Sequence, residues 1–175
     1  EAERISQLNL TGLLVLPESY RFYPEGQLGA HLLGFVNADG EGQYGLEGYY
    51  DDVLRGFRGA SSFERDPTGR AINFAQPLAP ARNGTSLVLT LDRNLQFMVE
   101  EYLAAAIKKF SADAGQIVVM NAKNGEILAM ASSPTFDPNS YQEAGENQSL
   151  FLNPVTQSMW EPGSVLKPLA LAAAL

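Results

Sequence analysis

The middle of the chain reads Gln116-Ile117-Val118-Val119-Met120-Asn121-Ala122-Lys123-Asn124-Gly125-Glu126-Ile127-Leu128-Ala129-Met130-Ala131. Two apolar runs, 116–120 and 126–131, are rich in strand-forming residues and are separated by a turn sequence. The Asn124-Gly125 pair supplies the positive φ angles that a short hairpin loop needs. This stretch therefore predicts two antiparallel strands.

A long amphipathic helix is predicted just before this hairpin. Asp92 is a typical N-cap residue, because its carboxylate can accept a hydrogen bond from a free N–H group of the first turn. The apolar residues that follow keep the 3.6-residue period: Leu95, Met98, Val99, Tyr102, Leu103, Ala106, Ile107 and Phe110. Residues 86–91 precede the helix and predict a further strand. Strand, helix and hairpin together predict an antiparallel sheet with a helix packed on it.

The residues before about position 80 follow another pattern. In chain order we predict an extended region over 1–24, a short helix over 27–35 that stops near Gly34, a loop over 37–42, an amphipathic helix over 45–54 closed by Gly56, and a hairpin over 59–74 with the turn Asp66-Pro67-Thr68-Gly69. The proline-rich residues 76–84 then predict a stiff linker. We place a domain boundary there, which divides the chain into domains over 1–80 and 81–175.

Composition limits the classes of function. The chain has 175 residues, of which 45% are hydrophobic and 18% are charged, so it can bury a core. The net charge of -8 argues against a nucleic-acid partner, and no run of about 18 apolar residues is present to span a bilayer. With no cysteine and one histidine, thiolate chemistry and a histidine-based metal cluster are excluded. We predict no cofactor and no metal.

Three polar residues of the first half are interpreted as structural. His31 has no second imidazole with which to share a metal, so a packed or capping role is favoured over a ligand role. Glu47 and Asp51 form an i,i+4 carboxylate pair that could suggest acid–base chemistry. Because nothing nearby supplies a nucleophile, we expect these carboxylates to be solvated or paired with a cation such as Arg21.

The candidate catalytic residues lie near the end of the chain, in Glu161-Pro162-Gly163-Ser164-Val165-Leu166-Lys167-Pro168. A Pro-Gly turn comes before the serine and an apolar run follows the lysine, which indicates the start of a helix, where Ser164 and Lys167 would share a face. Lysine can take the proton of the serine only when it is neutral, a state that burial favours. Backbone N–H groups at the helix start would stabilise an alkoxide. Pro168 suits a first turn.

Ser164 is therefore predicted to be a nucleophile and Lys167 its base. Taken alone, an S-x-x-K pattern is more often a solvated lysine after a serine cap, so the pair needs support from the rest of the chain.

Here the chain resembles a known family, the class B penicillin-binding proteins, which are peptidoglycan D,D-transpeptidases of cell division and elongation. Residues 161–168 match the active-site motif of that family. Further matching segments cover nearly the whole chain. The N-terminal domain of the family, called the pedestal or dimerisation domain, is matched by 21–24, 30–35 and 45–56; the transpeptidase domain is matched by 89–96, 125–132 and the loop residues Pro134, Asp137, Pro138 and Asn139.

The resemblance implies an α+β fold, with a mostly β, extended pedestal followed by the first part of a transpeptidase-type α/β domain. It implies that Ser164 is acylated by the penultimate D-Ala carbonyl of a peptidoglycan stem peptide (D-Ala-D-Ala) or by a β-lactam, that Lys167 takes the proton, and that a second peptide amine resolves the acyl-enzyme. Arg21 and Glu47 would pair structurally. Trp160 and Val165 stand where tyrosine and threonine are commoner.

The resemblance also implies a cellular setting. The protein would act at the extracytoplasmic face of the bacterial cytoplasmic membrane, anchored by an N-terminal helix that is missing from this chain. Its pedestal would bind other membrane proteins of division or elongation, and nucleic acid is not among the expected partners.

The S-x-N and K-T/S-G motifs of the family do not follow within these residues, and the last helix carries no stop signal. We therefore expect a piece of a larger protein that does not catalyse on its own. Two alternatives stay open: a non-catalytic docking module of the division or elongation machinery, and a β-lactam-sensing or β-lactam-hydrolysing relative. The pedestal argues against the second, because a simple hydrolase does not need it.

Overall fold

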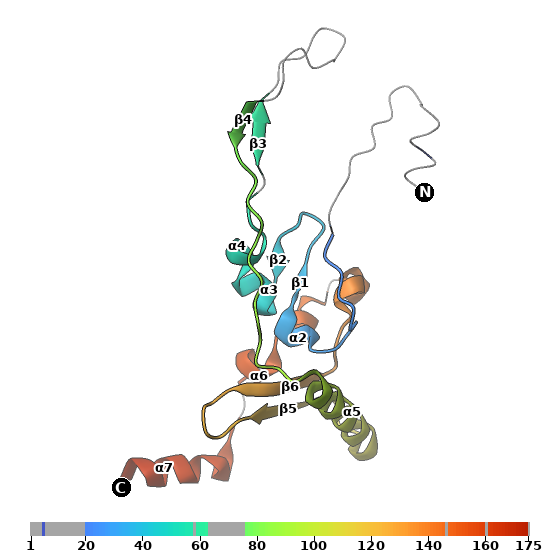
Figure 1. Ribbon diagram of the computed structural model, residues 1–175. Helices are drawn as coiled ribbons and strands as arrows, with labels where there is room; N and C mark the ends of the chain where they lie inside the picture. Colours follow the sequence, from blue (N-terminus) through green and yellow to red (C-terminus); the bar gives the residue numbers. More distant parts are fainter. Residues whose placement is uncertain are drawn as a thin grey trace.

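A computed structural model of the chain describes Ile5 and residues 20–57, 59–62, 76–145, 147–159 and 161–174 (Figure 1). Its helices and strands in chain order are α2 (Ala30–Leu33), β1 (Phe35–Val36), β2 (Gly42–Gln43), α3 (Gly45–Tyr49), α4 (Asp51–Leu54), β3 (Ala60–Ser62), β4 (Gln76–Ala79), α5 (Arg93–Phe110), β5 (Gly115–Met120), β6 (Ile127–Ser133), α6 (Pro154–Gln157) and α7 (Lys167–Ala174). Three 3-10 helices join them: η1 (Pro138–Ala144), η2 (Gln148–Phe151) and η3 (Gly163–Leu166). The mixed content agrees with the predicted α+β class.

The central hairpin forms as predicted. Strands β5 and β6 pair antiparallel from Gly115 opposite Ser133 to Met120 opposite Ile127, with one irregularity between Val119 and Met120. Gly125 lies in the loop with a φ of 79°, the left-handed conformation that the Asn-Gly pair indicated.

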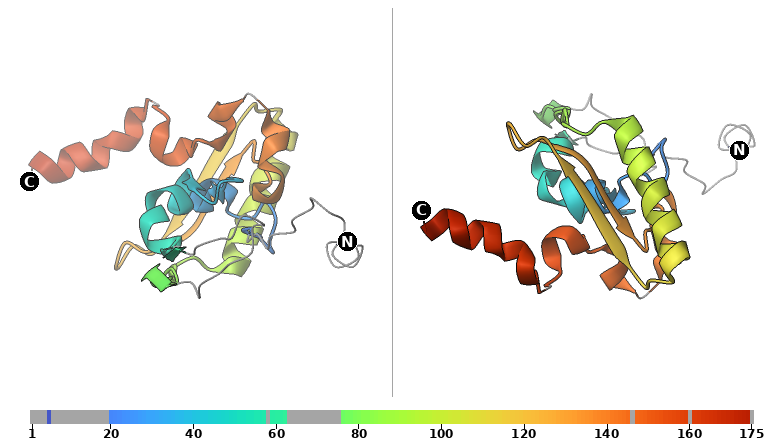
Figure 2. Two further views of the ribbon diagram at one scale, coloured as in Figure 1. Left: turned by 90° about the horizontal axis from the view of Figure 1, so that it is seen from above. Right: turned by 90° about the horizontal axis from the view of Figure 1, so that it is seen from below.

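Helix α5 packs on one face of this hairpin (Figure 2). The helix begins where the sequence predicts, because the Asp92 side chain accepts a hydrogen bond from the Leu95 N–H at 2.9 Å. Val99 and Leu103 of α5 are buried against Ala129 and Ala131 of β6. The small alanine side chains let the helix lie close to the strand. Helix α5 therefore forms one layer, and the β5–β6 hairpin forms a second layer packed against it.

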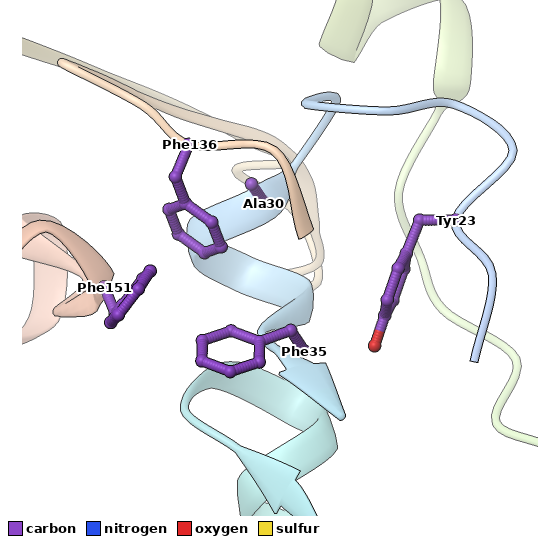
Figure 3. Close-up of a cluster of buried hydrophobic side chains, with 5 residues drawn as sticks. All are labelled: Tyr23, Ala30, Phe35, Phe136 and Phe151. Carbon is purple, nitrogen blue, oxygen red and sulfur yellow. The ribbon is translucent and has the colours of Figure 1, made fainter. Parts of the chain in front are cut away.

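A second core joins the two halves of the sequence (Figure 3). Tyr23, Ala30 and Phe35 come from the first half, and Phe136 and Phe151 come from the segment after β6. The ring centroids of Phe35 and Phe151 lie 4.9 Å apart, and those of Phe136 and Phe151 lie 5.0 Å apart, in edge-to-face contacts that favour aromatic packing.

This core corrects one expectation. The polar composition of the residues that follow the hairpin, to about Asn153, predicts a surface segment, but Phe151 and Asn153 are buried, with 6% and 8% exposure. The segment forms the short 3-10 helices η1 and η2, which are too short to show a hydrophobic period. The burial of its aromatic side chains in the core decides where the segment lies, although most of its residues are polar.

The predicted helices of the first half form with changes at their ends. The helix over 27–35 is limited to α2 and stops at Gly34, as expected, with a φ of 76°. The helix over 45–54 is divided into α3 and α4 at Tyr50, whose φ and ψ are −106° and 20°. Its expected apolar face is only partly covered, because Tyr49 is 81% exposed and Val53 is 45% exposed. The loop over 37–42 joins the small hairpin β1–β2, which the sequence did not reveal.

Two predictions near the expected linker are wrong. Residues 76–79 form β4, which pairs antiparallel with β3, rather than a linker. Residues 86–91 run as an extended segment without strand pairing among the described residues, and Val88 is 97% exposed. This segment is held by its ends, where Thr85 N–H bonds the Val53 carbonyl and Asp92 N–H bonds the Leu128 carbonyl.

Some predictions fall outside the described residues or are not tested by them. Most of the extended region over 1–24 and the turn at Asp66–Gly69 lie outside, and the domain boundary near residue 80 stays a prediction. Within the described ranges, no helix is both long and apolar enough to cross a membrane.

Candidate active site

The S-x-x-K stretch forms a 3-10 turn that leads directly into a helix. Residues 163–166 are the 3-10 helix η3, and α7 begins at Lys167. The Lys167 backbone N–H donates to the Ser164 carbonyl oxygen, which closes the turn. In a 3-10 helix, side chains at i and i+3 eclipse each other, so Ser164 and Lys167 lie on the same edge of the turn. The predicted common face is therefore present, in a tighter form than the expected α-helical start.

This turn also accommodates Pro168. A proline has no N–H group with which to bond the carbonyl four residues earlier, here that of Ser164. Because the Lys167 N–H already bonds this carbonyl, the proline leaves no acceptor without a donor. The first turn thus tolerates the proline, as predicted.

Both candidate side chains are exposed. In the two views of Figure 2, α7 extends away from the other elements. Val165, Leu166, Leu169 and Leu171 are each between 49% and 69% exposed, and Ser164 and Lys167 are exposed as well. No hydrogen bond joins the Ser164 and Lys167 side chains among those that the described residues make. The burial that a neutral lysine requires is not supplied by the part of the chain that the structure describes.

The element that leads to this stretch is anchored on the hairpin. Helix α6 has Asn153 as its N-cap, with the Asn153 Oδ1 atom accepting a hydrogen bond from the Val155 N–H at 3.0 Å. The Asn153 N–H in turn donates to Gln157 Oε1 at 2.7 Å, which makes the cap reciprocal. The Asn153 Nδ2 group also donates to the Met130 sulfur of β6 at 3.3 Å. Ser164 therefore follows a well-anchored helix.

The predicted pairing of Arg21 with Glu47 is confirmed. Arg21 Nε donates to Glu47 Oε1 at 2.8 Å, and the Glu47 side chain is 8% exposed. Tyr23 Oη donates to the same carboxylate oxygen at 3.4 Å. Burial, and then the Glu47 charge, raise the pKa of Tyr23 well above its usual value. Asp51 accepts the Gly42 N–H at 2.8 Å and pairs with Arg55, so both carboxylates have structural partners.

His31 is packed, as predicted. The side chain is buried at 6% exposure, its Nε2 group donates to the Leu150 carbonyl at 2.9 Å, and its ring meets Phe136 edge-on at 5.3 Å. Burial lowers the pKa of His31, although the Leu150 carbonyl and the Glu100 charge act in the opposite direction. No group of three or more possible metal-binding side chains occurs within the described ranges.

Two polar contacts that join distant elements are not predictable from local sequence. Asn139 bonds the backbone of Tyr23, and Gln96 bonds the backbone of Met130. An amide side chain can find its partner anywhere in the fold, so neither contact has a local signal.

One cavity among the described residues lies away from the candidate pair. It measures about 780 Å³ and is lined by Tyr20, Arg21, Leu46, Glu47 and the extended residues 84–87, among others. Neither Ser164 nor Lys167 lines it.

Two family models match the chain. The penicillin-binding protein dimerisation domain matches residues 1–89, and the penicillin binding protein transpeptidase domain matches residues 115–175. The second match contains the S-x-x-K turn.

Curated proteins and solved structures give the same result. Stage V sporulation protein D of Bacillus subtilis is 41% identical over 176 residues, which cover 100% of this chain and 27% of that protein. Probable peptidoglycan D,D-transpeptidase PbpC of Pseudomonas aeruginosa is 37% identical, with 100% of this chain and 31% of that protein covered. Penicillin binding protein 3 of Mycobacterium tuberculosis, complexed with aztreonam, is 37% identical with a TM-score of 0.70, over 87% of this chain and 30% of that one. The chain thus spans less than a third of the length of these relatives.

Proposed function

This chain belongs to the class B penicillin-binding proteins, and from that premise we propose that it supplies the nucleophile and the base of a peptidoglycan D,D-transpeptidase. The observation that carries the proposal is the η3 turn, which sets Ser164 and Lys167 on one edge at the start of α7, inside the region that matches the transpeptidase domain. Relatives named as peptidoglycan D,D-transpeptidases support the reaction.

The proposed reaction has two acyl transfers. The Ser164 Oγ atom attacks the carbonyl carbon of the penultimate D-Ala of a stem peptide while its proton passes to the Lys167 amine. The tetrahedral intermediate collapses, the bond to the terminal D-Ala breaks, and that D-Ala leaves with a proton on its amine. An amine of a second stem peptide then attacks the Ser164 ester, the bond to Ser164 Oγ breaks as the cross-linking amide forms, and a proton from that amine passes through Lys167 to Ser164. A β-lactam would acylate Ser164 in the same first step, and one solved relative is a complex with the β-lactam aztreonam.

The exposure of the pair bears on where catalysis occurs. Lys167 can act as a base only in surroundings that exclude water, and Ser164 needs further donors for the oxyanion. The chain spans less than a third of the length of its relatives. We therefore propose that other residues of the full-length protein supply the surfaces that exclude water from Lys167 and the donors that bind the oxyanion. On that proposal the chain alone does not catalyse.

We also propose that the protein acts on the extracytoplasmic side of the cytoplasmic membrane, where peptidoglycan is assembled, with an anchoring helix outside these residues. Its pedestal would dock membrane proteins of division or elongation. The support is a set of exposed aromatic side chains in the first half: Tyr20, Phe22, Tyr49 and Phe57, with exposures of 83%, 62%, 81% and 56%. If the chain were only such a docking module, Ser164 would have no chemical role.

Labelling with a fluorescent penicillin separates the enzyme from the docking module. We expect the full-length protein to form a covalent adduct at Ser164, and the Ser164→Ala variant to lose it. Ser158→Ala is the matched control, since Ser158 is an exposed serine of the same segment and should leave labelling intact. A full-length protein that remains unlabelled, or that is labelled equally after Ser164→Ala, would refute the proposed function.

A further inference from the structure

Gln96 of α5 binds the edge of β6 as a neighbouring strand would. Its Nε2 group donates to the Met130 carbonyl oxygen at 2.8 Å, and its Oε1 atom accepts the Met130 N–H at 2.8 Å. Gln96 is 2% exposed, so the amide lies in a place where an unpaired polar group would be unfavourable. The amide therefore determines where the backbone of Met130 lies.

The second proton of this amide reaches a carboxylate that also contacts the pedestal. Gln96 Nε2 donates to Glu100 Oε1 at 2.7 Å, and the same oxygen accepts the Gly29 N–H at 2.8 Å. Gly29 precedes α2 in a left-handed conformation, with a φ of 67°. Glu100 thus holds the start of α2 and the Gln96 side chain at one point.

The Met130 side chain contacts the start of helix α6. Its sulfur accepts a hydrogen bond from Asn153 Nδ2 at 3.3 Å, and Asn153 is the N-cap of α6. Helix α6 packs against β5 and β6 and is the last element before the turn that holds Ser164. One methionine is therefore bound through its backbone by α5 and through its sulfur by α6.

We propose that Gln96 is a positioning residue for acylation at Ser164. By holding the Met130 backbone, it places the sulfur that Asn153 binds, and so sets the start of α6, from which the chain continues to the S-x-x-K turn. Glu100 connects the same amide to the pedestal. This inference rests on the proposed function, because it concerns the rate at which Ser164 becomes acylated.

The test compares acylation kinetics in the full-length protein. Stopped-flow measurements with a fluorescent penicillin separate the acylation rate constant from the dissociation constant of the initial complex. We expect Gln96→Met to lower the rate constant about tenfold, because small displacements of reacting groups slow a reaction without preventing binding. The dissociation constant and the final extent of labelling should stay unchanged. A variant that is partly unfolded would instead show a lower final extent of labelling.

A second variant tests the contact between the Met130 sulfur and Asn153 alone. Met130→Leu keeps the side-chain volume and the backbone bonds to Gln96 but removes the sulfur acceptor for Asn153. It should lower the same rate constant to a similar degree. Gln96→Met added to it should have little further effect, because the effects of two substitutions that break the same chain of contacts are not additive. Glu101→Gln, at an exposed neighbour of Glu100, is the control and should react like the unmodified protein.

The outcomes are distinct. Unchanged acylation in Gln96→Met, or in Met130→Leu where Gln96→Met does not fold, overturns the inference, as do independent effects that multiply in the double variant. If the unmodified full-length protein is not acylated at Ser164 at all, the proposed function fails first.

Discussion

Tyr23 and Asn139 are joined by two hydrogen bonds between a backbone and an amide. The Tyr23 N–H donates to Asn139 Oδ1 at 2.9 Å, and Asn139 Nδ2 donates to the Tyr23 carbonyl oxygen at 2.9 Å. The amide thus acts as a peptide group of a neighbouring strand would. It connects the pedestal segment just before α2 to the loop that leaves the central hairpin, beside the aromatic core that both segments share.

Asn139→Asp tests this connection. A carboxylate has nearly the same shape but cannot donate, so the bond to the Tyr23 carbonyl is lost together with the bond from the same group to Asp137 Oδ1 at 3.1 Å. We expect a loss of about 1 kcal/mol in the free energy of unfolding of the full-length protein, measured by chemical denaturation at neutral pH. The control is Asn83→Asp, at an exposed asparagine. Equal stability of the two variants would show that the bonds to Tyr23 add nothing.

The aromatic core leads to a larger expected effect. Phe136 is 5% exposed and meets His31, Phe35 and Phe151 edge-on. Phe136→Ala would leave a cavity among these rings, and we expect a loss of about 3 to 5 kcal/mol in the free energy of unfolding.

Phe22→Ala is the matched comparison for Phe136→Ala. Phe22 is 62% exposed, so the same truncation there should change the free energy of unfolding by less than about 1 kcal/mol. Denaturation curves that shift equally for both variants would contradict a core shared by the two halves of the chain.

The elements that could be predicted from the sequence are those with a strong local signal. Helix α5 has an N-cap and a long hydrophobic period, and the β5–β6 hairpin has two apolar runs around an Asn-Gly turn, so local chemistry alone specifies them. Residues 86–91 have strand composition but no paired neighbour among the described residues, and strand formation depends on such a neighbour. The pairing of β4 with β3 is not predicted from the sequence, because the prolines of residues 76–84 indicate a linker.

The same division applies to the candidate site. The spacing of Ser164 and Lys167, with Pro-Gly before them and Pro168 after them, predicted a shared face, and the 3-10 turn provides it. The contacts of Gln96 and Asn139 could not be predicted, because a side-chain amide finds its partner only in the folded chain. The environment of Lys167 also depends on tertiary packing, which four residues of sequence do not encode.

Two glycines with similar positive φ angles should respond differently to alanine. Gly34 ends α2 with a φ of 76°, and a Cβ there would overlap the carbonyl oxygens of Gln43 and Tyr44. Gly125 has a φ of 79°, but a Cβ there would meet nothing within 4 Å. We expect Gly125→Ala to cost about 1 kcal/mol, the penalty of the left-handed conformation alone.

Gly34→Ala should cost about 3 kcal/mol or more, since backbone must move as well as adopt the unfavourable angle. Thermal or chemical unfolding of the two full-length variants measures the difference. If both substitutions lower stability by the same amount, the close approach of α2 to the β2–α3 connection is not as tight as described.

His31 predicts a dependence of stability on pH. Burial lowers the pKa of His31 in the folded protein below its ordinary value of about 6.5. At pH 7.5 the imidazole is neutral in both the folded and the unfolded protein. As the pH falls below about 6.5, the unfolded protein takes up a proton first, so the free energy of unfolding decreases until the folded protein is protonated as well.

His31→Gln removes this titration while keeping a donor for the Leu150 carbonyl. Carboxylates that titrate in the same range are present in both proteins, so the comparison of the two cancels their effect to first order. We expect the unmodified protein to lose more stability than His31→Gln between pH 7.5 and pH 5, measured by denaturant unfolding at each pH. Parallel pH profiles would mean that His31 has the same pKa in the folded and unfolded states, and that its burial against Phe136 does not oppose protonation.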